Sequence, residues 1–255
     1  MKRYIIALLL MVCAHVLSAQ QALRATDELR VGVIGMYDQR FLAAQFAQLP
    51  DVASCCQSFG DEQHGGYTVG VVAELPLSIG LAPSLRMLYT QLGGEFTSNE
   101  EKYAYDGTLA SVQASFLHTI DARVHALVIE PGMRITSDGG FNFGLGVQLG
   151  YLVDATYTQR EQIASPSSIT YAGGTRERNV QSGDLPNLND WQIGLNLGVG
   201  YDLHVADIPE LVIGPEVNYT YNFSKIIDGI NWKTHNLRAG IVAKWTFLVN
   251  STIAP

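Results

Sequence analysis

Hydrophobic and polar side chains alternate strictly along several stretches of this chain. Between Trp191 and Val205 every odd-numbered residue is apolar or aromatic, and every even-numbered one is a glycine, an amide, Asp202 or His204. Successive side chains of a β-strand point to opposite faces, whereas helical spacing would scatter the two sets around a cylinder. The pattern therefore predicts a strand with one apolar face and one polar face.

The same alternation recurs seven more times, which predicts an all-β chain. Most of the segments have ten or more residues, against about 5–6 for an ordinary globular strand, and a membrane-spanning strand needs about 9–11. Long segments with apolar side chains outward and polar side chains inward are typical of transmembrane β-barrels. The eight predicted strands are 29–37, 67–77, 81–89, 123–135, 141–153, 191–205, 211–223 and 237–247.

The connections between these strands alternate between short and long. Barrels of the outer membrane have short periplasmic turns and longer extracellular loops, so the order predicts an antiparallel up-and-down barrel with both termini in the periplasm. Residues 108–120 could be an additional strand, an extension of strand 123–135 or a hairpin in an outer loop, which leaves a ten-stranded barrel as the alternative. The short connections lie near 76–80, 136–140 and 205–210, the long ones at 38–66, 92–121 and 160–189, and one of medium length at 225–233.

The N-terminal residues have the layout of a secretory signal peptide. A basic start is followed by the apolar run 4–12, which is too short for a membrane anchor, and then by small and polar residues. We predict cleavage after Ala19, and Gln20 in place of a cysteine argues against a lipoprotein. The predicted organisation is a signal peptide at 1–19, a short segment at 20–28, a barrel at 29–248 and a tail at 249–255.

The composition narrows the possible functions. Only 16% of the residues are charged and 47% are hydrophobic, with 25 glycines and 12 tyrosines. This argues against a disordered chain, and a net charge of −8 argues against nucleic-acid binding. Glycine-rich stretches follow strand phase, and the histidines have no metal spacing. We therefore expect no enzymatic activity, no cofactor and no metal.

Cys55 and Cys56 are adjacent loop thiols, either free or joined in a vicinal bridge.

The polar face carries equal numbers of acidic and basic residues. An eight-stranded barrel is just wide enough for side chains to fill its interior, so balanced charge there predicts paired ions rather than an open pore. The predicted lumen network comprises Arg30, Glu74, Arg86, Glu130, Arg134, Asp154, Asp202, Glu216, Arg238 and Lys244.

Aromatic residues gather on the apolar face, many of them near strand ends. Amphipathic rings favour the membrane–water interface, where they form girdles at both rims of a barrel. The predicted girdle residues are Tyr37, Tyr89, Tyr151, Trp191, Tyr201, Tyr219, Tyr221, Trp245 and Phe247.

With these features the chain resembles the outer-membrane β-barrel domain proteins of Gram-negative bacteria, in particular the small OmpA/OmpX-type barrels and the PorT-like barrels of Bacteroidetes-type bacteria. The alternation of Ala243, Trp245 and Phe247 after Arg238 and Gly240 resembles the terminal-strand signal of such barrels. The resemblance implies outer-membrane lipid and the barrel assembly machinery as partners. It favours a structural or interaction role with a plugged lumen and long extracellular loops. A narrow pore or transporter for small solutes, and a secreted lipocalin-like binding barrel, are the alternatives.

Overall fold

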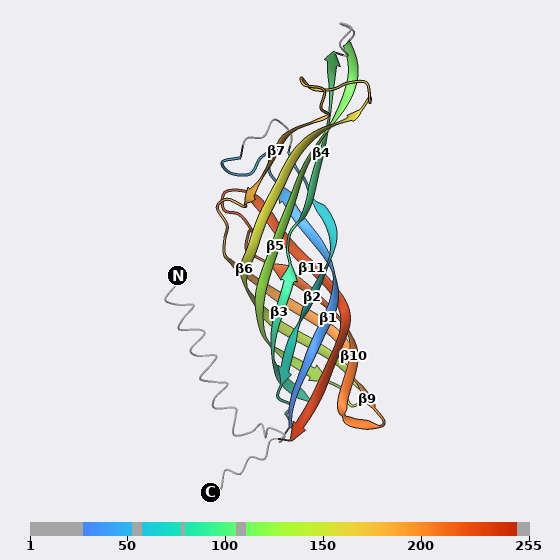
Figure 1. Cartoon of the computed structure of the whole chain (residues 1–255). Coiled ribbons are helices and arrows are strands. Elements are labelled where there is room, and N and C mark those ends of the chain that lie inside the picture. Colours follow the sequence, from blue (N-terminus) through green and yellow to red (C-terminus); the bar gives the residue numbers. More distant parts are fainter. Residues whose placement is uncertain (1–27, 53–57, 78–79, 106–110, 249–255) are drawn as a thin grey trace, which may run out of the picture.

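The computed structural model describes residues 28–52, 58–77, 80–105 and 111–248. Within these ranges the chain forms eleven strands joined in one antiparallel sheet (Figure 1). None of the described segments is a helix with the length and apolarity needed to cross a membrane. The strands are β1 (Glu28–Gln45), β2 (Glu62–Glu74), β3 (Leu81–Gln91), β4 (Gly94–Tyr105), β5 (Ser111–Thr136), β6 (Phe141–Ser165), β7 (Glu177–Asp184), β8 (Trp191–Tyr201), β9 (Leu203–Val205), β10 (Ile208–Asn222) and β11 (Asn231–Leu248).

Eight of the strands close into a ring in the order β1, β2, β3, β5, β6, β8, β10, β11 and back to β1. The first and last strands form the closing seam, with an unbroken antiparallel register from the pair Glu28–Leu248 to the pair Gln45–Asn231. This confirms the predicted eight-stranded barrel. The ten-stranded alternative is wrong because β3 pairs directly with β5, which leaves β4 outside the ring.

Both ends of the described barrel chain lie at the same end as its three short turns (Figure 1). The turn between β5 and β6 shows how tight these connections are. Gly140 has a φ of +84°, and a Cβ atom on it would lie 2.6 Å from the carbonyl oxygen of Asp202. Glycine is therefore the residue that this turn accommodates without strain. We call this end the lower end of the barrel.

At the upper end, β5 and β6 continue far beyond the ring (Figure 1). They have 26 and 25 residues, and a rise of about 3.3 Å per residue makes each roughly 80 Å long. Their upper halves pair with β4 on one side and β7 on the other, giving a four-stranded sheet that we call the extension. The prediction of loops at 92–121 and 160–189 is therefore wrong over much of both ranges. Residues 111–120 extend the predicted strand 123–135 and also form a hairpin with β4.

The predicted loop 38–66 is also too long, because β1 runs on to Gln45 and β2 begins at Glu62. Side chains of β1 continue to alternate between the inner and the outer face in this region, but the inward residues change from charged to apolar. Asp38 and Arg40 face inward, and above them Leu42 and Ala44 are buried inward as well. Because apolar residues now lie on the inner face, the contrast that identified the lower part of the strand disappears.

The apolar face of the ring points away from the lumen. Val33, Leu145 and Leu197 are 62%, 52% and 47% exposed, whereas Glu74 and Arg238 are 2% and 1% exposed. A soluble lipocalin-like barrel would need the opposite arrangement, with the apolar face lining its cavity. That alternative is therefore wrong.

Two levels of exposed aromatic rings bound this apolar face. Phe141 lies opposite Tyr201 at the lower level, and Tyr151 lies opposite Trp191 at the upper level. The two levels are ten residues apart along both β6 and β8, which is about 33 Å along a strand. With a strand tilt of about 40° this becomes roughly 25 Å along the barrel axis, the height of the apolar band of a membrane barrel.

Candidate functional site

The lowest layer of the lumen is a ring of four charged side chains from different strands. Arg134 Nη1 lies 2.9 Å from Glu74 Oε1, and Arg134 Nη2 lies 2.8 Å from Asp202 Oδ1. Lys244 Nζ completes the ring, 3.0 Å from Glu74 Oε2 and 3.2 Å from Asp202 Oδ2. Within the ring each charge contacts two of opposite sign, Arg134 also lies 3.4 Å from Glu216 Oε2, and all four side chains are at most 4% exposed. We call these four residues the charge ring.

A second group of ion pairs lies above the charge ring. Arg86 Nη2 is 2.6 Å from Glu216 Oε1, and Asn218 Nδ2 donates to the same oxygen at 2.7 Å. Arg238 Nη2 is 2.7 Å from Glu130 Oε1. Because these groups are buried and hydrogen-bonded to opposite charges, separating any pair would leave a desolvated charge inside the barrel.

Two charged residues that the sequence analysis missed stand higher in the lumen. Asp38 Oδ2 accepts hydrogen bonds from the hydroxyls of Thr68 at 2.6 Å and Thr90 at 3.1 Å. Arg40 donates to two backbone carbonyl oxygens, one of them that of Gly93. Continuing the alternation of β1 past residue 37 would have placed both residues on the polar face.

Above these residues the lumen is filled by apolar side chains. Phe96 packs edge-on against Trp232 with ring centroids 5.0 Å apart, and against Phe46 with centroids 5.2 Å apart. Leu49, Leu92, Phe96 and Trp232 are fully buried. We call this group the apolar cap. It comes from the strand ends and loops of the upper end, where the sequence pattern predicts long extracellular loops.

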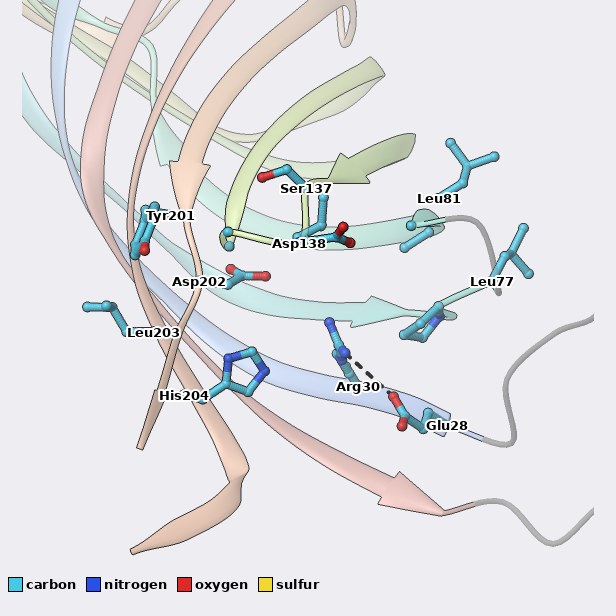
Figure 2. Close-up of a pocket in the computed structure, with 16 residues that line it drawn as sticks. Glu28, Arg30, Leu77, Leu81, Ser137, Asp138, Tyr201, Asp202, Leu203 and His204 are labelled. Atoms are coloured by element: carbon cyan, nitrogen blue, oxygen red, sulfur yellow. Dashed lines mark hydrogen bonds and ion pairs between the residues drawn. The ribbon is translucent and has the colours of Figure 1, made fainter. Parts of the chain in front are cut away.

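The lower mouth of the barrel holds a cavity of about 510 Å³, lined by the short turns and by the start of β1 (Figure 2). Its inner limit is Asp202, a member of the charge ring. At its edge Arg30 lies 3.5 Å from Glu28, with side chains 20% and 37% exposed. Higher up, a cavity of about 20 Å³ borders Arg86 and Glu130, which is close to the space that one water molecule needs.

Two of the ten predicted lumen residues lie elsewhere. Arg30 is at the lower mouth, because it is close to the end of the barrel wall. Asp154 points outward, with its side chain 55% exposed and 3.3 Å from His125. The register of β5 and β6 shifts between His125 and Ala126, which inserts one extra residue in β6 and reverses the phase beyond it. Ala155 therefore takes the inward position in place of Asp154. The other eight predicted residues line the lumen.

The remaining predicted site residues divide into two groups. Cys55 and Cys56 lie outside the residues that the structure describes. The aromatic residues predicted for the girdles all project from the outer face, and Tyr89 is half-buried because it stacks on His125 with ring centroids 5.4 Å apart. Among the described residues, no group of three or more histidine, cysteine or acidic side chains could hold a metal ion.

Comparison with known proteins now gives the family. A model described as "outer membrane protein beta-barrel domain" matches residues 19–228. The chain belongs to this family. Outer-membrane barrels of this family cross the membrane with their strands, and the eight-stranded ring is the membrane-spanning part of this chain.

Two solved structures are similar to this chain over most of its length. The Neisserial surface protein A is 12% identical, covers 87% of this chain and 99% of its own, and has a TM-score of 0.39. Ail, the attachment invasion locus protein of Yersinia pestis, is 11% identical with the same coverages and the same TM-score. No curated protein sequence matches the chain.

Proposed function

We propose that this outer-membrane barrel is a closed, non-catalytic interaction protein that carries its extension outside the cell and both termini in the periplasm. The observation that carries the proposal is a lumen filled by the charge ring and the apolar cap, beneath a four-stranded sheet that rises above the membrane band. Outer-membrane lipid surrounds the ring, and the barrel assembly machinery inserts it.

The filled lumen supports the closed state. An ion crossing the barrel would have to separate buried pairs such as Arg238–Glu130 and displace Trp232 from the apolar cap. Breaking one buried pair costs about 3–5 kcal/mol. We therefore expect no steady current when the purified barrel is reconstituted in a planar bilayer. Reproducible single-channel steps would overturn this part of the proposal and support the narrow pore.

The direction of the extension follows from connection length, since long connections of outer-membrane barrels face outward. Lys102, near the tip of β4, has a side chain that is half exposed. Trypsin added to intact cells should therefore cleave the chain at the tip. Cleavage that requires a permeabilised outer membrane would place the extension in the periplasm instead.

Among the described strands, β4 has a paired neighbour on one side only, and its other, free edge suggests how a partner binds. At its base, His64 Nε2 contacts both the backbone N–H of Glu95, at 3.1 Å, and its carbonyl oxygen, at 2.6 Å. Backbone groups of alternate residues point to the same side of a strand, so Tyr103 and Tyr105 direct theirs to the same free edge. Their side chains are 77% and 72% exposed. An edge of this kind can pair with an extended peptide.

A peptide array tests this edge. Replacing Tyr103 with proline removes an edge N–H while keeping the hydrogen bonds between β4 and β5. Tyr103→Pro should lose the peptides that the wild-type barrel binds, whereas Tyr103→Ala should keep most of them. Equal binding by the proline variant would show that the partner does not add a strand at this edge.

A further inference from the structure

The lower part of the β4 edge is occupied by side chains of β2. Glu62 Oε1 accepts hydrogen bonds from the backbone N–H of Thr97 at 3.3 Å and from its hydroxyl at 2.9 Å. His64 contacts the backbone of Glu95, two residues lower, in a similar way. These two side chains stand where a further strand would bind, so a partner strand is confined to the part of β4 above Thr97.

Above Thr97 the backbone of β4 offers hydrogen bonds on its open side. Backbone groups of alternate residues point to the same side of a strand, so the open positions are those in phase with Glu95 and Thr97. Among the described residues no strand pairs with this side of β4. An open edge of this kind is a template for another strand. The open positions are Asn99, Glu101, Tyr103 and Tyr105.

The direction of β4 decides how two copies of the chain could meet at this edge. β4 runs away from the membrane band toward the tip of the extension (Figure 1), so the β4 strands of two copies in one membrane run parallel. A two-fold axis along the membrane normal would place each N–H opposite the same N–H of the other copy, which forms no hydrogen bonds. In copies that face each other from two membranes the strands run antiparallel, and opposite residues exchange both backbone bonds.

One register of this antiparallel self-pairing joins at least three open positions without opposing like charges. A two-fold axis at Tyr103 places this residue opposite its own copy, and Glu101 opposite Tyr105. Lys102 then faces Ala104, which is small and uncharged. An axis at Lys102 or at Glu101 would instead place like charges directly opposite each other, which is destabilising. The strand is therefore self-complementary about Tyr103.

The side chains around this axis suit the contact. The two tyrosines of each copy are strongly exposed on the outer face, so the register gathers four rings, and aromatic cross-strand neighbours favour pairing. Glu101 Oε2 accepts a hydrogen bond from Gln113 Nε2 at 2.6 Å. Lys102 Nζ lies 2.5 Å from Glu100 Oε1. Both charged residues at the contact therefore enter it with a partner from their own chain.

We infer that β4 of one copy pairs antiparallel with β4 of a second copy in a facing membrane, so that the extensions join two cells through a shared sheet. A single contact of this kind is short, but many copies on both membranes act together and raise the effective affinity. The inference deepens the proposed function, because the partner strand becomes a second copy of the chain. It rests on that proposal for the position of the extension outside the cell.

Disulfide cross-linking between two populations of lipid vesicles tests the pairing. Each population carries the folded barrel with Tyr103→Cys and its own affinity tag, in a background where Cys55 and Cys56 are replaced by serine. Mild oxidation of the mixture should give a dimer with both tags, because hydrogen-bonded antiparallel residues have Cα atoms about 5.5 Å apart, within disulfide reach. Lys102→Cys is the matched control, and it should lose this dimer because it faces Ala104.

Aggregation of vesicles that carry no cysteine variant gives a second readout. Light scattering of wild-type vesicles should rise with the density of the protein. Tyr103→Phe keeps the ring and the edge N–H, so it should aggregate like the wild type. Tyr103→Pro removes the edge N–H and should leave the vesicles dispersed.

Three results would overturn the inference. An equal yield of mixed-tag dimer from Lys102→Cys would contradict the register. A dimer that forms inside dilute, unmixed vesicles, in place of the mixed one, would show pairing within a single membrane. Dispersed wild-type vesicles without cross-links would exclude a second copy as the partner. Failure of the proposed function looks different, because the vesicles would pair whereas intact cells with the two tags would not.

Discussion

Lys244→Met in the charge ring is the substitution that most directly tests the lumen. It removes an ammonium group that lies 3.0 Å from Glu74 and 3.2 Å from Asp202, in a side chain that is 1% exposed. At an effective dielectric constant of about 20, each contact is worth about 5 kcal/mol before desolvation. Methionine fills similar volume, so the loss is electrostatic. Since Arg134 remains beside both carboxylates, we expect a net loss of about 3–5 kcal/mol in the free energy of unfolding.

Urea unfolding of the barrel in lipid vesicles measures this loss, with the shift of the folded band on unboiled gels as a second readout. Glu74→Gln, added to Lys244→Met, rebalances the ring and should recover about 2 kcal/mol as a coupling energy. Arg30→Met is the matched control, because its pair with Glu28 is partly exposed and worth less than about 1 kcal/mol. If Lys244→Met lowers the free energy of unfolding by less than about 1 kcal/mol, the charge ring is not desolvated and the reasoning is refuted.

Three other substitutions test the lipid-facing side of the barrel wall, the apolar cap and the lower turns by the same unfolding assay. Leu197→Arg, near the middle of the membrane band and 47% exposed, should cost about 2–4 kcal/mol; a loss near zero would mean that this face does not meet lipid. Trp232→Ala should cost about 3–5 kcal/mol because its ring is fully buried, and an unchanged urea midpoint would contradict the packing of the cap. Gly140→Ala should cost about 1–3 kcal/mol from its φ of +84°, and full stability would show that the turn relaxes freely.

The ring of the fold was predictable from sequence because one physical rule governs each of its strands. Wherever lipid covers one face and a polar lumen covers the other, side chains alternate visibly, as they do from Trp191 to Tyr201. The rule fails at the upper end, where the apolar cap lies inside the barrel and water lies outside. Leu42 is buried on the face that carries Asp38, so hydropathy no longer distinguishes the two sides.

Most of the charged lumen was predictable for the same reason, and the misses have local causes. Asp154 departs because a β-bulge changes phase, and a bulge leaves no reliable mark in a single sequence. The extension was missed because both faces of β7 are exposed, which removes the contrast on which periodicity depends. The pairing of particular charges, such as Arg134 with Glu74 and Asp202, depends on barrel geometry that alternation alone does not contain.

The closing seam has a consequence for how the protein is made. β1 pairs with β11 along all eighteen residues of each strand, and the two are separated by nearly the whole chain. During synthesis β1 is complete long before β11, its second neighbour in the barrel, has been made. The edge of β1 that pairs with β11 therefore stays open until β11 emerges. Contacts this distant in sequence form slowly, and an open edge invites pairing with other chains. Truncation within β11 should therefore yield aggregate rather than a smaller barrel.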